Sequence, residues 1–218
     1  MIRGHNHFGE RHVVHKQIVI LGAGGFAREA YCWARDAGRE VVAFLSEQRE
    51  LQKIYGISVV NDPSFLKGLE FVIGTGAPRT THKLVNLARN AGMFPADPIV
   101  HPSAVLGEEV YIGLGSIICP GVTITCDAVI GMYCLLNLNA TVGHDAKLGD
   151  FCSVAPGANI SGRCDIGSFS YLGTNCALRE GIDVGIGSTI GMGAVVTKNV
   201  PDEETWVGNP AKPLHIVK

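Results

Sequence analysis

The sequence predicts an α/β domain followed by an all-β domain of stacked short strands. The first third of the chain shows the strand, glycine turn, helix, strand pattern of a βαβ unit. The remainder repeats every six residues, a period that fits neither a helix nor an ordinary amphipathic strand. With 218 residues, 46% of them hydrophobic, the chain can bury the core of one large or two small domains.

The α/β pattern opens with QIVIL at residues 17–21, an apolar run typical of a strand. A glycine loop then starts a helix that ends at Gly38, and VVAFLSE predicts the second strand. FVIGTGAPR predicts a further strand, PRTTHKLVNLARNAG a helix, and Asp62 the start of a short helix. We therefore expect a small Rossmann-like domain at residues 16–95, after an N-terminal extension at residues 1–15.

The glycine loop matches a loosened dinucleotide fingerprint, Gly22-x-Gly24-x-x-Ala27. Its physical basis is a helix N-terminus whose backbone N–H groups face phosphate with no side chain in the way. Glu47 lies at the distance where an acidic residue binds a ribose hydroxyl. The predicted domain is shorter than a whole dinucleotide-binding domain, which argues against an NAD-binding protein.

The repeat covers residues 99–200, which divide without a gap into hexads. The second position of every hexad is Val, Leu or Ile, and glycine fills the third position in nine of them. Short strands joined by tight corners explain this period, because three hexads of about 18 residues close one triangular coil and stacked coils bury an aliphatic column. We place this β domain at residues 96–200 and a C-terminal tail at 201–218.

One hexad carries a candidate catalytic pair, His144 and Asp145. The histidine occupies the fourth position, at or near a corner where side chains face outward. A lone outward histidine is most often a surface residue. A neutral imidazole is also the suitable general base for an attacking amine or hydroxyl, and a neighbouring carboxylate such as Asp145 can orient it.

Three segments together resemble the hexapeptide-repeat sugar acyltransferases. They are the glycine loop GAGGFARE, the stretch from Asn137 to Ala158 that contains His144, and the closing segment WVGNPAK. The resemblance is to the branch of sialic acid O-acetyltransferases and N-acetyltransferases of nucleotide-linked 4-amino-4,6-dideoxy sugars. It implies a left-handed parallel β-helix, a homotrimer with active sites between subunits, and acetyl-CoA as co-substrate without a metal.

The resemblance also implies roles for individual residues. His144 would be the general base, oriented by Asp145. Substrate-binding residues would surround the diphosphate, sugar, ribose or base: Gly22, Gly24, Gly25, Phe26, Ser46, Glu47, Gly74 and Asn137. Coenzyme A would contact Ser153, Gly162, Met192 and Lys198. Two departures stand out, because relatives often carry Asp-Asp at Ser46-Glu47 and some carry a second histidine at Ser153.

These expectations combine into an acetyl-CoA-dependent N-acetyltransferase that acylates the 4-amino group of a nucleotide-linked sugar by direct transfer. Its product would enter a surface glycan such as lipopolysaccharide. O-acetylation of a sugar hydroxyl, as in sialic acid, is the alternative within enzymes. A structural or binding module is the alternative from another class, but it has no need for the pattern around His144.

Composition excludes several other classes. The net charge of −2 and the lack of a basic block argue against a nucleic-acid partner. No apolar run reaches membrane-spanning length, and the polar N-terminus lacks the apolar centre of a signal peptide, so we expect a cytoplasmic protein without a membrane partner. The seven cysteines form no C-x-x-C pair, which indicates free thiols.

Overall fold

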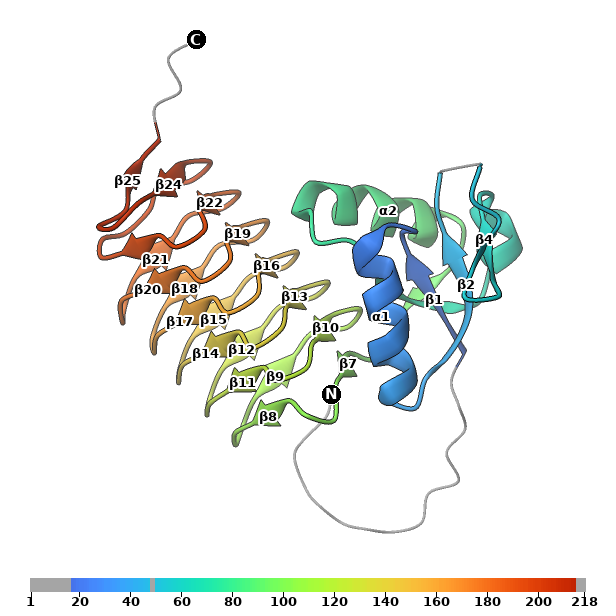
Figure 1. The fold of residues 1–218 in the computed structure, drawn as a ribbon, viewed down its shortest axis with the longest axis horizontal. Helices are drawn as coiled ribbons and strands as arrows, with labels where there is room; N and C mark the ends of the chain where they lie inside the picture. Colours follow the sequence, from blue (N-terminus) through green and yellow to red (C-terminus); the bar gives the residue numbers. More distant parts are fainter. Residues whose placement is uncertain (1–16, 48–49, 215–218) are drawn as a thin grey trace.

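A computed structural model describes residues 17–47 and 50–214. Its two parts are an α/β domain and a long coil of short parallel strands that lie side by side (Figure 1). This architecture confirms the predicted Rossmann-like domain followed by a left-handed parallel β-helix. The N-terminal extension expected at residues 1–15, which includes His5 and His7, lies outside the described residues.

The α/β domain is a six-stranded sheet in the order β3-β4-β2-β1-β5-β6, with all pairs parallel except β3 and β4. Its strands are β1 Gln17–Leu21, β2 Glu40–Leu45, β3 Lys53–Ile54, β4 Ile57–Val60, β5 Glu70–Ile73 and β6 Phe94–Pro95. Its helices are α1 Gly25–Asp36, α2 Pro78–Asn90 and the short 3-10 helix η1 Pro63–Leu66. The hairpin of β3 and β4 has no counterpart in our sequence prediction.

Each hexad of the repeat forms one two-residue strand, and every third strand joins the same sheet. The first sheet contains β7 Ile99–Val100, β10 Ile117–Ile118, β13 Leu135–Leu136, β16 Ser153–Val154, β19 Tyr171–Leu172 and β22 Thr189–Ile190. The second contains β8 Val105–Leu106, β11 Thr123–Ile124, β14 Thr141–Val142, β17 Asn159–Ile160, β20 Ala177–Leu178 and β23 Val195–Val196. The third contains β9 Tyr111–Ile112, β12 Val129–Ile130, β15 Lys147–Leu148, β18 Asp165–Ile166 and β21 Asp183–Val184.

Paired residues in neighbouring coils lie 18 positions apart, as Leu136 and Val154 do. From the third coil strand onward, the aliphatic second residue of the strands is almost always buried in the central column. The fifth hexad position has positive φ in most corners, including Asp145 at 58° and Phe151 at 61°. This left-handed conformation turns the chain sharply at each corner and costs energy for a residue other than glycine.

The predicted tail closes the coil. β24 Thr205–Val207 pairs with β22 and β25 Lys212–Pro213 pairs with β24, so both continue the first sheet. Trp206 is buried at this end of the aliphatic column, and its Nε1 donates a hydrogen bond of 2.6 Å to Glu204. The segment WVGNPAK thus covers the apolar end that the last coil would otherwise expose.

An aromatic stack fixes the α/β domain against the coil. Tyr133, Phe151 and Phe169 follow one another at an 18-residue spacing, with ring centroids 4.9 Å apart in each consecutive pair. His82 of α2 meets Phe151 and Phe169 edge-on, at 5.2 and 5.3 Å. We call the corner that follows the third sheet the docking corner, with Gly115, Tyr133, Phe151, Phe169 and Gly187 at its fifth positions.

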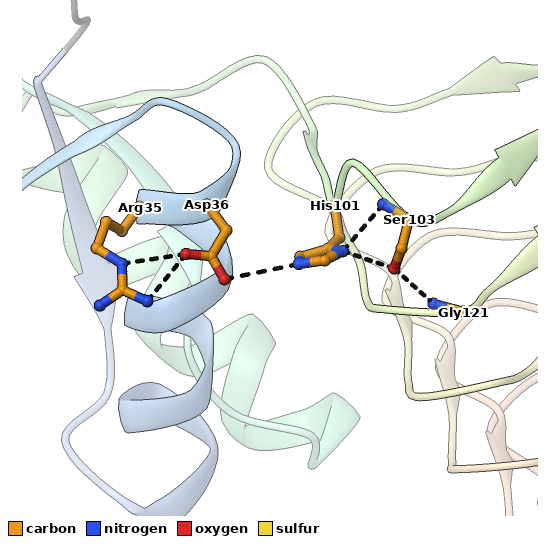
Figure 2. A network of polar contacts seen from close by, with 5 residues as sticks. All are labelled: Arg35, Asp36, His101, Ser103 and Gly121. Carbon is orange, nitrogen blue, oxygen red and sulfur yellow. Dashed lines mark hydrogen bonds and ion pairs between the residues drawn. The ribbon is translucent and has the colours of Figure 1, made fainter.

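A polar network joins the same two parts near the start of the coil (Figure 2). His101 lies 3.6 Å from the carboxylate of Asp36 at the end of α1, and its other ring nitrogen lies 2.8 Å from the Ser103 hydroxyl. The guanidinium of Arg35 beside Asp36 lowers the pKa of that carboxyl. His101 thus links the two domains.

Candidate active site

A pocket of about 360 Å³ lies at the carboxyl ends of β1, β2 and β5. Seven of the residues predicted to bind the nucleotide sugar line it: Gly22, Gly24, Gly25, Phe26, Ser46, Glu47 and Gly74. Ligands of open parallel α/β sheets bind at this edge, in the crevice outside the strand ends. We call this cavity the N-terminal pocket.

The glycines of the N-terminal pocket fall into two kinds. A Cβ atom on Gly74 would lie 2.5 Å from Ile20 and 2.7 Å from the carbonyl oxygen of Leu21, and one on Gly22 would lie 2.8 Å from the carbonyl of Gly74. These two positions are glycine because the strand ends approach closely. A Cβ on Gly24 would meet nothing within 4 Å, so this position leaves open space for a ligand.

Two helix N-termini point positive dipole ends toward this region. The residue before α1 is Gly24 and the residue before α2 is Ala77, and neither provides a side-chain cap. Neither helix has an acidic residue in its first turn. Free N–H groups and the helix dipole together favour a bound phosphate.

The predicted ribose or base end of the pocket is held by polar contacts that the sequence did not reveal. The Asn61 amide donates a hydrogen bond of 2.7 Å to the carbonyl oxygen of Ser46. Glu47 forms an ion pair of 2.8 Å with Lys83 of α2. The acidic side chain of Glu47 therefore lines the pocket while paired with a lysine of α2.

A second pocket of about 620 Å³ continues from the first and lies between the two domains. The pockets share Phe26, Gly76 and Thr80. Its coil side includes the predicted residues Asn137 and Ser153, both on the first sheet or directly after its strands. Arg79 lines it as well, and its single nitrogen Nη2 donates to both carboxylate oxygens of Glu203, at 2.8 and 2.6 Å.

His144 and Asp145 lie at the corner after β14, which joins the second and third sheets. We call this the histidine corner. Residues adjacent in an extended strand point in opposite directions, but the left-handed Asp145, at φ 58°, brings its carboxylate next to the histidine. His144 Nδ1 lies 2.7 Å from Asp145 Oδ2, so the carboxylate can orient the ring and leave Nε2 free.

Gly162 occupies the place of His144 one coil further along. A Cβ atom there would lie 2.5 Å from His144 Nε2, so the imidazole uses the space that a side chain would fill. Among the described residues, the N–H groups of His144, Gly162 and Glu180 donate no hydrogen bond. At the docking corner, by contrast, Asp150 accepts from the N–H of Met132 and Ser168 accepts from that of Asp150.

The predicted coenzyme residues lie at separate places. Gly162 and Lys198 share the histidine corner, at the fourth hexad position, with Lys198 exposed. Met192 is exposed at the corner between the first and second sheets, and Ser153 lies buried beside the interdomain pocket. One chain therefore brings only Gly162 and Lys198 to the corner that carries His144.

The histidine corner is the one corner of each coil that does not touch the first sheet. Both pockets lie on the side of the first sheet and the docking corner, and His144 lines neither. Asn137 and His144, only seven positions apart, consequently lie on different sides of the coil. Among the residues that line the two pockets, none belongs to the histidine corner.

Within the described part of the chain, no group of three or more His, Cys, Asp or Glu residues is arranged to hold a metal ion. None of the helices described is long and apolar enough to cross a membrane.

Comparison with known proteins supports the resemblance seen in the sequence. Residues 17–87 match the model of the PglD N-terminal domain. A variant of perosamine N-acetyltransferase from Caulobacter crescentus, solved with CoA and GDP-perosamine, has a TM-score of 0.87 and 30% identity, covering 92% of this chain and 97% of that one. The chain belongs to the hexapeptide-repeat sugar acyltransferases.

Two other members have similar structures. WeeI from Acinetobacter baumannii AYE has a TM-score of 0.83 and 30% identity over 91% of this chain and 100% of that one. The acetyltransferase domain of PglB from Neisseria gonorrhoeae, solved with acetyl coenzyme A, has a TM-score of 0.81 and 30% identity over 92% of this chain and 100% of that one. A comparison with curated proteins gives no match.

Proposed function

We propose that this acyltransferase transfers the acetyl group of acetyl-CoA to the 4-amino group of a nucleotide-linked 4-amino-4,6-dideoxy sugar, with His144 as general base. One observation carries the proposal. His144 and Asp145 form an oriented pair at 2.7 Å, on a chain that also has a phosphate-compatible pocket. Its similarity to a perosamine N-acetyltransferase solved with CoA and GDP-perosamine supports the same substrate class.

The N-terminal pocket suits the nucleotide part of the acceptor. The N-termini of α1 and α2 would hold the diphosphate, with open space above Gly24 for its approach. Glu47 would bind a hydroxyl of the ribose. The connected interdomain pocket gives the sugar room to extend away from the phosphates along Asn137 and Ser153.

The histidine corner suits the transfer step. His144 Nε2 would take a proton from the amine as the C–N bond forms, and would return it to the sulfur as the C–S bond breaks, so that coenzyme A leaves as the thiol. Asp145 would stabilise the imidazolium. The free N–H of Gly162, beside the imidazole, would donate to the developing oxyanion, and Lys198 would attract coenzyme phosphates.

We further propose that the protein acts as a homotrimer in the cytoplasm, in the assembly of a surface glycan such as lipopolysaccharide. Its active site would combine the pockets of one subunit with the His144 of another. The position of His144, at the corner away from the first sheet, supports this sharing. A shared site would explain why activity requires the oligomer, because a single chain would hold two separated halves of the site.

A thiol-release assay tests the proposed reaction. Acetyl-CoA would be offered with UDP-, GDP- and dTDP-linked 4-amino-4,6-dideoxy sugars and with free sialic acid. We expect turnover of one amino sugar, and its loss in His144→Ala but not in Cys126→Ala, whose residue occupies the same corner one coil earlier. Turnover of sialic acid alone, or full activity of His144→Ala, would contradict the proposal.

A further inference from the structure

The histidine corner places three residues of different chemistry in one column. His144, Gly162 and Glu180 occupy the same hexad position in successive coils, as the pairings of Val142 with Ile160 and of Ile160 with Leu178 show. Backbone hydrogen bonds of 2.8 Å from Arg163 to His144 and of 3.0 Å from Gly181 to Gly162 hold the three corners in line. Side chains at this position, those of His144 and Glu180, therefore extend from the same side of the coil with Gly162 between them.

Gly162 makes the two outer side chains neighbours. Any side chain at this position would overlap the imidazole, since its Cβ would lie 2.5 Å from Nε2 and 2.7 Å from Cε1. Without one, the ring lies across the intermediate coil and faces the next. His144 Nε2 thus reaches 4.0 Å from Glu180 Oε1, although the two residues belong to coils two steps apart.

The Glu180 carboxylate is held in place but does not bond to the imidazole. Arg163 forms an ion pair with the same oxygen, Oε1, whereas the 4.0 Å to Nε2 exceeds hydrogen-bond length. Asp145 occupies the opposite ring nitrogen. The nitrogen that would accept the substrate proton is therefore open, with a fixed negative charge beside it.

We propose that Glu180 binds the protonated amine of the acceptor sugar next to His144 and so selects an amine over a hydroxyl. This inference rests on the proposed function. An ammonium nitrogen about 2.9 Å from each of two acceptors fits beside a gap of this length, with one N–H directed to Nε2 and a second to Glu180. A hydroxyl has one proton and satisfies only one of these acceptors.

The negative charge of Glu180 also favours transfer of a proton to His144, because it stabilises the imidazolium. One of the three ammonium protons passes to His144 Nε2 and on to solvent, which leaves the neutral amine that attacks the thioester. While the ring carries that proton, it lies between the carboxylates of Asp145 and Glu180, which both favour the cation. The other charged residues at this corner are Arg163, which pairs with Glu180, Lys198 one coil beyond Glu180, and Glu108, Glu109 and Asp127 in the coils before His144.

The test measures binding of two ligands that differ in one group. Calorimetry would compare GDP-perosamine with the otherwise identical GDP sugar that has a 4-hydroxyl group, on the wild type, Glu180→Gln and Glu108→Gln. Glu108 occupies the same corner position four coils before Glu180 and is exposed, so it is a matched control. If the thiol-release assay gives the highest turnover with an amino sugar linked to another nucleotide, that amino sugar and its 4-hydroxyl counterpart are used in place of the two GDP sugars.

We expect Glu180→Gln to reduce the preference for the amine about tenfold, the scale of one charge-assisted hydrogen bond. The KM for the amino sugar should rise by a similar factor, while Glu108→Gln behaves as wild type. If folded Glu180→Gln still acetylates the amine and keeps the wild-type preference for the amino sugar over the hydroxyl sugar, the proposed role of Glu180 is wrong. The proposed function would stand in that case. Failure of the wild type to acetylate any 4-amino sugar would overturn the proposed function and this inference together.

Discussion

The docking corner and the histidine corner have nearly the same backbone and opposite uses. Both turn through a left-handed fifth residue, at 61° for Phe151 and 58° for Asp145. At the docking corner, stacked rings and side-chain caps fill the surface and bind α2. At the histidine corner, the N–H groups of His144, Gly162 and Glu180 donate no hydrogen bond to any described residue, and they lie beside an open imidazole nitrogen. The repeat therefore sets the backbone of both corners, and the fourth and fifth residues of the hexad decide whether a corner packs against α2 or stays open to solvent.

The largest contrast comes from one substitution at each corner. His144→Ala should lower kcat by about 10²–10⁴-fold, the usual contribution of a general base, with little change in the unfolding free energy. Phe151→Ala should lower the unfolding free energy by about 2–3 kcal/mol, less than the roughly 3–5 kcal/mol of a fully buried phenylalanine. Steady-state kinetics and denaturant unfolding of both variants measure the contrast.

If both variants lost only activity, or both lost only stability, the two corners would not have separate functions. Destabilisation by His144→Ala, with activity per folded molecule unchanged, would be the clearest contradiction.

A similar separation is expected between two glycines of the N-terminal pocket. Gly24→Leu should keep the stability of the fold, because the position has open space and φ of −81°, but it should abolish nucleotide binding. Gly74→Ala should instead lower stability by about 1–3 kcal/mol through its clash with β1. Thermal unfolding and titration with GDP, UDP and dTDP distinguish these outcomes, and tight nucleotide binding by Gly24→Leu would refute the placement of the ligand.

A smaller effect is expected from chemical modification of a cysteine at the histidine corner. Cys126 is exposed one coil before His144, whereas burial raises the pKa of the Cys176 thiol to about 12 and also raises that of Cys164. Only a thiolate reacts readily. N-ethylmaleimide should therefore label Cys126 far faster than the buried cysteines and slow turnover, and Cys126→Ala should resist inhibition. Equal inhibition of Cys126→Ala would show that another thiol is responsible.

The smallest effect concerns the polar link between α1 and the coil (Figure 2). The pKa of Asp36 is lowered by Arg35, so its ionised form favours the folded state above the ordinary carboxyl pKa, and this contribution disappears as the pH falls through the lowered value. Asp36→Asn should thus lower the melting temperature slightly at pH 7, with the difference shrinking in acid. A difference that grows in acid would contradict this sign.

Much of the fold followed from sequence periodicity. The hexads predicted every strand from β7 to β23. One aliphatic residue every six positions fits a coil of short strands and fits neither a helix nor a long amphipathic strand. The β3 and β4 hairpin was missed, since two short strands around Tyr55 and Gly56 carry no clear alternation. Contacts between distant segments, such as His82 with Phe151 and Arg79 with Glu203, have no local signal at all.

The candidate site was predicted as a set of residues but not as an arrangement. His144 and Asp145 were found together because they are adjacent, and the left-handed corner supplies the contact that an extended strand would prevent. Glu180 was missed, although its 36-residue distance from His144, two turns of the repeat, was visible in the sequence. The same count would have separated Asn137 from His144 onto different sides of the coil.

The most direct test of a site shared between subunits mixes two inactive chains. Gly24→Leu keeps His144 and loses the pocket, while His144→Ala keeps the pocket and loses the base. Unfolded together and refolded at equal amounts, they should form mixed oligomers with about one quarter of the wild-type activity, because random pairing unites an intact pocket with an intact histidine at that frequency. Mixed oligomers with no activity above that of the separate variants would show that each chain uses its own His144, and would contradict the shared site.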